Sequence, residues 1–148
     1  MRGDVGLERD DVPDATMRAL IDEQFPWLAG RELGRRYTLE DHLSVRIGDD
    51  YGAIFPRFEK DDALFARVAD LLRPVASTWS FYASYPVATG VPGHGYPYHW
   101  VIVEWNAASI AGYVPLLRES AAPLGKAIRE IHVPSPADAP VNPVAGTG

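Results

Sequence analysis

The sequence predicts an α+β fold in which helices flank a mainly antiparallel sheet. Apolar residues recur at helical spacing in three segments, and between the first two of these segments they alternate with a period near two. The elements follow one another as helix, hairpin, strand, helix, two strands and helix, without the strand–helix alternation that builds a parallel sheet. The 148 residues fit one domain, since a domain typically has about 150 residues.

The composition is that of a globular chain, and it excludes several functional classes. The hydrophobic fraction is 47% and the charged fraction 23%, so a core can form. The net charge is -6, so we expect no binding to nucleic acid or to an anionic membrane surface. Cysteine is absent, which removes thiolate metal sites and cysteine nucleophiles. No apolar run approaches the roughly 20 residues of a membrane span, and the charged start is unlike a signal peptide, so we expect a cytoplasmic protein.

The first half of the chain predicts a helix and then a hairpin. Residues 1–12 are charged and aperiodic, which is typical of a frayed leader. A helix is expected between Pro13 and Pro26, because apolar residues recur on one face. Residues 43–47 then alternate between apolar and polar, residues 48–50 form a turn, and residues 51–55 return as the second strand.

The second half predicts a helix, two strands and a final helix. Asp61 or Asp62 caps a helix that ends at Pro74. The aromatic residues between Ser77 and Val87 favour a strand, and the β-branched run that follows Trp100 favours a buried one. The last helix is expected within residues 116–132, where Leu117, Ala121, Leu124, Ile128 and Ile131 recur at helical spacing. The proline-rich tail, residues 133–148, is expected to be extended.

A series of short motifs resembles, in order, the amino-terminal lobe of aminoglycoside phosphotransferases, which are kinase-like enzymes acting on small molecules. The resemblance covers roughly residues 14–145, and its most specific part is the Gly-x-Pro to Tyr-Pro to Trp stretch. The segments are Phe25-Pro-Trp-Leu-Ala-Gly, Asp41-His-Leu-Ser-Val-Arg-Ile-Gly-Asp, Phe55-Pro-Arg, Gly90-Val-Pro-Gly-His-Gly-Tyr-Pro-Tyr-His-Trp, Glu104-Trp105 and Ile131-His132.

This resemblance implies a division of the chain and a nucleotide site. The kinase-like nucleotide-binding lobe would comprise residues 13–106, and residues 107–132 would form the hinge and the first helix of a second lobe. Asp41 matches the Asp of the family's phosphate loop. The hinge strand that passes behind the adenine of ATP would comprise four residues: Val103, Glu104, Trp105 and Asn106. From the residues alone, Trp100 and Trp105 are more simply interpreted as core aromatics, because large rings in a strand usually pack.

The residues that would hold the phosphates of ATP are missing or unmatched. Kinase-type transfer needs a loop over the phosphates, a basic residue on them, an acid that orients this base, and a second lobe with the catalytic Asp and the Mg ligands. Residues 37–40 contain no glycine, and the basic position on the third strand falls on Ile54. The acidic partner would fall near Ala69, where only Asp70 is close. The His-x-Asp motif is absent from the 148 residues.

Two functions therefore remain open. The first is an ATP-dependent phosphotransferase domain that is truncated and inactive alone, binds ATP weakly or not at all, and uses Mg only with a complementing catalytic lobe. The second is a non-catalytic kinase-like interaction module. In either case we expect a homodimer or a complementing lobe to cover the apolar stripe of the helix within residues 116–132, because exposed apolar surface is costly.

Other constellations are not expected to carry chemistry. His94 and His99 are five residues apart, which fits no standard zinc spacing. Asp41, His42 and Ser44 are residue types of a catalytic triad, but neighbours on a strand point to opposite faces, so we expect no triad.

Overall fold

The computed structural model describes residues 12–57, 62–83, 85–105, 118–134 and 137. Residues 1–11 of the predicted leader, Asn106, residues 107–117 and most of the proline-rich tail lie outside these residues. None of the described helices is both long and apolar enough to cross a bilayer.

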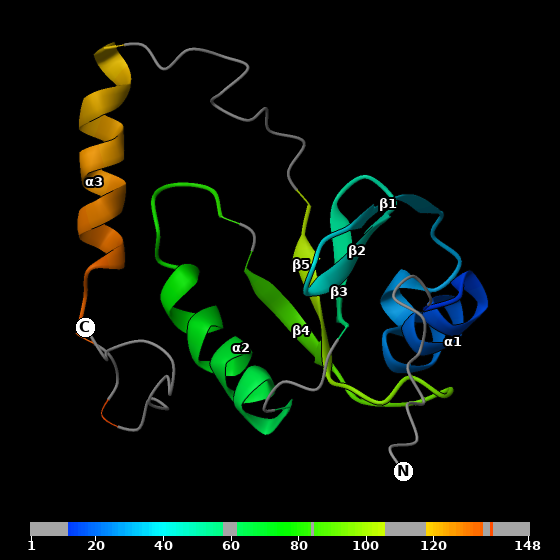
Figure 1. Cartoon of the computed structure of the whole chain (residues 1–148). Helices are drawn as coiled ribbons and strands as arrows, with labels where there is room; N and C mark the ends of the chain where they lie inside the picture. The colour runs from blue at the N-terminus through cyan, green and yellow to red at the C-terminus, as the bar shows by residue number, and fades with distance from the viewer. Residues whose placement is uncertain (1–11, 58–61, 84, 106–117, 135–136, 138–148) are drawn as a thin grey trace.

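The fold is α+β, as predicted, and it is built on one antiparallel sheet (Figure 1). The five strands lie in the order β1-β2-β3-β5-β4, and every neighbouring pair is antiparallel. The predicted hairpin is confirmed as β2 and β3, and the predicted buried strand as β5. The strands are β1 (Leu33–Thr38), β2 (His42–Ile47), β3 (Tyr51–Pro56), β4 (Pro86–Gly90) and β5 (Trp100–Glu104).

Two helices cover opposite faces of this sheet. The predicted first helix is confirmed as α1 (Asp14–Gln24), and the 3-10 helix η1 (Pro26–Leu28) follows it. Met17, Leu20 and Ile21 of α1 are fully buried against the sheet. The helix α2 (Asp62–Ala76) packs on the other face, where Ala69 contacts a small apolar cluster of β3 and β5.

Trp100 lies at the centre of the larger core, on the face covered by α1. Its ring is fully buried, stacks on Phe55 at 4.8 Å between centroids, and meets Phe25 edge-on at 5.2 Å. The indole N–H donates to the carbonyl of Val91 at 3.1 Å. Gly90 lies directly beneath the ring, because a Cβ there would be 2.2 Å from an indole carbon. Trp100 is therefore a core residue.

Two expectations about the middle of the chain are wrong. The helix α2 continues past Pro74 to Ala76, and the N–H of Ser77 still reaches the carbonyl of Arg73 at 3.1 Å. Residues 77–83 and Tyr85, the described part of the aromatic segment before Pro86, form no strand, and β4 begins at Pro86. Side chains end the helix instead: the hydroxyls of Ser77 and Thr78 each donate at 2.8 Å to carbonyls of its last turn.

The last helix is also present within the predicted residues 116–132. The 3-10 helix η2 (Arg118–Ser120) leads into α3 (Ala121–Ile131), which stands apart from the sheet (Figure 1). Glu130 accepts hydrogen bonds from the backbone N–H and the hydroxyl of Ser80, both at 2.7 Å. These bonds tie α3 to the loop after α2.

Candidate functional site

The predicted site residues lie at two ends of the sheet. Val103 and Glu104 are the last residues of β5, and Trp105 follows them directly, whereas Asp41 lies in the turn between β1 and β2. Glu104 pairs with Tyr51 at the first residue of β3, and His42 pairs with Pro56 at its last. The hinge and Asp41 are thus separated by the length of β3, roughly 17 Å for strand geometry.

The backbone at the hinge is held by the protein itself. Trp105 donates its N–H to the carbonyl of Asp50 at 2.8 Å, which joins the end of β5 to the β2–β3 turn. Val103 is buried and packs with Ala69 of α2. The N–H of Trp105 could bond to a nucleotide base only if its bond to the Asp50 carbonyl broke. Recognition at this end of β5 therefore depends mainly on side chains.

The indole ring of Trp105 lies close against Gly52 of β3. A Cβ at Gly52 would be 2.5 Å from an indole carbon, so only glycine at this position lets the ring approach. The ring of Tyr37 in β1 is 5.5 Å away between centroids, and the guanidinium of Arg35 lies 5.1 Å from the centre of the Tyr37 ring. Gly52 and Ile54 share one face of β3, so the ring lies on the face that carries Ile54. Position 54, where the resemblance places the phosphate-binding base, is called the clamp position below.

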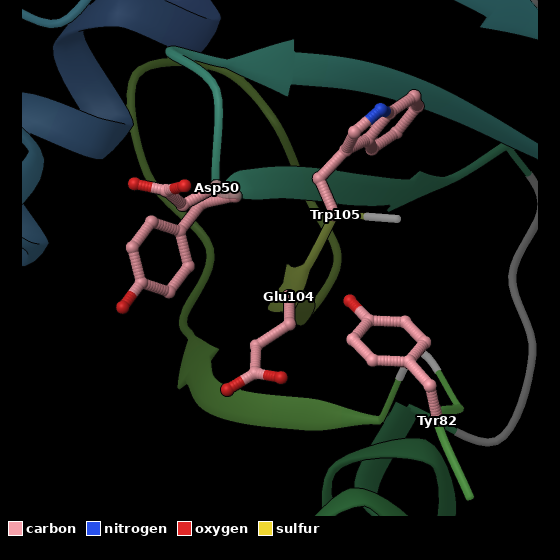
Figure 2. Close-up of a pocket in the computed structure, with 5 residues that line it drawn as sticks. Asp50, Tyr82, Glu104 and Trp105 are labelled. Atoms are coloured by element: carbon pink, nitrogen blue, oxygen red, sulfur yellow. The ribbon is translucent and has the colours of Figure 1, made fainter. Parts of the chain in front are cut away.

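A shallow pocket opens beside Trp105, between the hinge and the β2–β3 turn (Figure 2). Its volume is about 250 Å³. Figure 2 shows the hydroxyl of Tyr82 pointing toward the space between Trp105 and Glu104. The lining residues are Asp50, Tyr51, Tyr82, Glu104 and Trp105. The pocket thus combines carboxylates and aromatic rings.

The clamp position carries no charge. Ile54 on β3 packs against Ala69, Val101 and Val103 and extends the apolar cluster beneath α2. The acidic residue nearest to the expected partner position is Asp70, which forms an ion pair with Arg73 at 3.2 Å. The base and its acidic partner are therefore both missing from the expected positions, which hold Ile54 and Ala69.

The β1–β2 turn at the other end of the sheet is closed without glycine. The N–H of Leu39 donates to the carbonyl of His42 at 2.9 Å. Arg57 holds this turn twice, since its guanidinium donates to the carbonyl of Leu39 at 2.7 Å and its N–H to that of Asp41 at 3.0 Å. The turn is therefore fixed in place by its neighbours.

Asp41 and His42 do meet, contrary to the alternation argument. The Nδ1 of His42 lies 2.6 Å from an Asp41 carboxylate oxygen. Asp41 precedes β2 and lies outside the strand, so the alternation of side chains along a strand does not apply to it. Ser44 does not complete a triad, because no hydrogen bond joins it to His42 in the described part of the chain.

No metal site appears among the described residues. They contain no group of three side chains of the kinds that could hold a metal ion. His94 contacts the carboxylate of Glu23 on α1 instead, which ties the loop after β4 to that helix.

This five-stranded antiparallel sheet, with a helix on the face that carries Ile54, has the arrangement of a kinase-like amino-terminal lobe. Solved aminoglycoside phosphotransferases share it. A GDP complex of wild-type aminoglycoside 2'-phosphotransferase-IIIa matches with a TM-score of 0.62 and 15% identity, over 78% of this chain and 40% of that one. A streptomycin–ATP ternary complex of APH(2")-IIa matches with a TM-score of 0.57 and 14% identity, over 86% and 43%.

These structures confirm the predicted fold, and this chain spans about two fifths of their length, 40% and 43%. No protein-family model matches the sequence, and the curated proteins contain no match to it.

Two of the lining residues, Glu104 and Trp105, are among the residues predicted from the sequence, whereas Asp50, Tyr51 and Tyr82 are not. Asp50 could have been found, because the predicted hairpin register places its turn beside the end of the following strand. Tyr82 carried no such signal, because it lies in a segment that aromatic content alone assigned to a strand.

Proposed function

We propose that the chain is a kinase-like nucleotide-facing lobe that has lost its hold on nucleotide phosphates, so that these 148 residues do not transfer phosphate on their own. The observation that carries this proposal is Ile54, an apolar residue packed under α2 at the position of the phosphate-binding base. Phosphoryl transfer depends on positioning and on charge stabilisation, and Ile54 supplies neither.

Three further features support the loss. The β1–β2 turn has no glycine and is held by Arg57, so its backbone cannot approach a phosphate closely. The carboxylate of Asp41, the residue that matches the family's phosphate-loop Asp, already contacts the Nδ1 of His42 at 2.6 Å. Trp105 covers Gly52, and a base stacked on this face would have to displace the ring.

Nucleotide binding tests the proposal through its dependence on phosphate. Titrations with adenosine, ADP and ATP, followed by calorimetry, should give dissociation constants that do not improve as phosphates are added. A dissociation constant near 1 mM at 1 mM ligand stabilises the fold by only RT ln 2, about 0.4 kcal/mol. An ATP affinity tenfold or more above that of adenosine, about 1.4 kcal/mol, would show a working phosphate clamp.

A pair of variants at position 54 isolates the missing charge. Ile54→Lys adds an ammonium group, and Ile54→Met is the matched uncharged side chain of similar length. Since Arg57 holds the β1–β2 turn away, we expect the ATP to adenosine ratio to stay the same in both variants. A rise in Ile54→Lys alone would mean that the turn still closes over the phosphates.

A non-catalytic interaction module is the second candidate, and one observation favours it. Leu124, Ile128 and Ile131 of α3 are 53%, 45% and 49% exposed, which leaves an apolar stripe in water. In such a module a second copy of the chain would cover this stripe, whereas under the first candidate a complementing lobe that supplies the His-x-Asp motif and the Mg ligands would cover it. The two occupants differ in outcome, because only the complementing lobe would restore phosphate transfer.

A further inference from the structure

The pocket beside Trp105 has a chemistry that a nucleotide does not explain. Two of its lining residues are acidic, Asp50 and Glu104, and three are aromatic, Tyr51, Tyr82 and Trp105. Carboxylates repel phosphate, whereas aromatic faces attract cations through their quadrupoles. The lining therefore favours a positively charged group.

Glu104 supplies an uncompensated negative charge. Within the described part of the chain its carboxylate has no hydrogen bond and no ion pair. The other carboxylate, Asp50, has only a distant partner, since its oxygen lies 3.9 Å from Arg31 and the Asp50 side chain is 76% exposed. The strongest unbalanced charge in the pocket is thus that of Glu104, next to Trp105.

Two arginine side chains of the protein lie over aromatic rings near Trp105. The guanidinium of Arg31 lies 5.6 Å from the centre of the Tyr51 ring, which lines the pocket. Arg35 lies over Tyr37 in the same way, and Tyr37 contacts Trp105. The arrangement shows that rings here attract cations, and the partly exposed indole of Trp105 offers a further aromatic surface beside the pocket.

We propose that this pocket binds the ammonium group of a small organic cation, held between Trp105 and Tyr82 with the Glu104 carboxylate as counter-ion. The volume of about 250 Å³ is sufficient for an alkylammonium head group and small for a complete nucleotide. The site goes beyond the function proposed above, because it needs neither Ile54 nor a phosphate.

Choline and its neutral isostere 3,3-dimethyl-1-butanol test the proposal. The two molecules share shape and differ in charge, so choline should bind saturably and the alcohol should not. Binding is followed by the indole N–H resonance of Trp105 in nitrogen–proton NMR spectra, assigned with Trp105→Phe. Equal affinity for both molecules would show an apolar pocket and overturn the proposal. The absence of a saturable shift with choline up to about 100 mM would overturn it as well.

Two variants separate the charge from the fold. Glu104→Gln should weaken choline binding by about fivefold or more, because it removes the counter-ion and keeps the size of the side chain. Glu119→Gln, an exposed change in η2 outside the pocket, is the matched control and should leave the affinity unchanged. Tyr82→Leu removes a ring without changing charge and should also weaken binding. Equal affinity in wild type and Glu104→Gln, with unchanged melting curves, refutes the assignment of Glu104.

Discussion

Two glycines lie beneath tryptophan rings in this sheet, and replacing each with alanine should have very different effects. At Gly90 a Cβ would be 2.2, 2.4 and 2.6 Å from three atoms of Trp100, and at Gly52 it would be 2.5 and 3.0 Å from two atoms of Trp105. The overlaps are similar in depth, but Trp100 is fully buried and Trp105 is partly exposed. The outcome therefore depends on whether each ring can move.

For Gly90→Ala the ring has no free space. Trp100 stacks on Phe55 and meets Phe25 edge-on, so moving it disturbs the core and weakens its hydrogen bond to Val91. Overpacking costs about 1 to 3 kcal/mol and a lost hydrogen bond about 1 kcal/mol, so we expect a loss of about 2 to 4 kcal/mol. That is a large share of a typical domain stability of about 5 to 15 kcal/mol.

For Gly52→Ala the indole of Trp105 can turn toward solvent. Alanine also gains about 0.5 to 1 kcal/mol over glycine in a strand, so the net loss should stay near 1 kcal/mol or below. The indole resonance of Trp105 should shift as the ring leaves the sheet.

Urea unfolding of both variants measures the difference. We expect the loss for Gly90→Ala to exceed that for Gly52→Ala by about 1 kcal/mol or more. As a control, Trp105→Ala should cost less in the Gly52→Ala background than in the wild type, because the contact is already lost. Equal losses in the two glycine variants would refute the argument from ring mobility.

Three other predictions follow from contacts outside the pocket. Hydrogen bonds from Ser80, and then the charge of Lys126, hold the pKa of Glu130 below its ordinary value of 4.5. Its contact therefore stabilises the docking of α3 above pH 4.5 and is lost as the pH falls through the lowered pKa, so hydrogen exchange in α3 should accelerate there in wild type and not in Glu130→Gln. Ile128→Asp should abolish assembly in sedimentation while leaving the melting temperature of the lobe unchanged, because the side chain is 45% exposed; unfolding of this variant would contradict an exposed stripe. Tyr96→Phe should lower stability by about 1 kcal/mol in urea unfolding, since its buried hydroxyl donates to the carbonyl of Pro56 at 2.7 Å, and an unchanged midpoint would count against this bond.

Local patterns predicted most of the fold because packing follows them closely. The spacing of Met17, Leu20 and Ile21 gave one buried helix face, and the alternation in residues 43–47 gave one buried strand face. The failures arose where side chains compete with the backbone pattern. Ser77 and Thr78 bond to carbonyls of α2 and end the helix, and the aromatics that follow pack together, as shown by the Trp79 and Phe81 rings stacked at 5.0 Å.

The candidate site was predictable only in part, because it depends on contacts between distant segments. Position 54 could be found from the neighbouring Phe55-Pro-Arg motif, and its packing against Ala69 confirms the face on which it lies. The closeness of Trp105 to Gly52 was not predictable, because both residues are compatible with many strand environments. Tyr82 comes from a loop whose path is set by the bonds between Ser80 and Glu130.

Both outer edges of the sheet resist pairing with another strand, which limits how copies of this chain can aggregate. At one edge, β1 carries Arg35 and Arg36, and its register shifts within residues 33–36, so a neighbouring backbone meets charge and an irregular ladder. At the other edge, β4 begins with Pro86, which has no N–H to donate, and Arg73 already occupies the Pro86 carbonyl. Fibre-like growth by strand addition is therefore disfavoured at both edges of the described sheet.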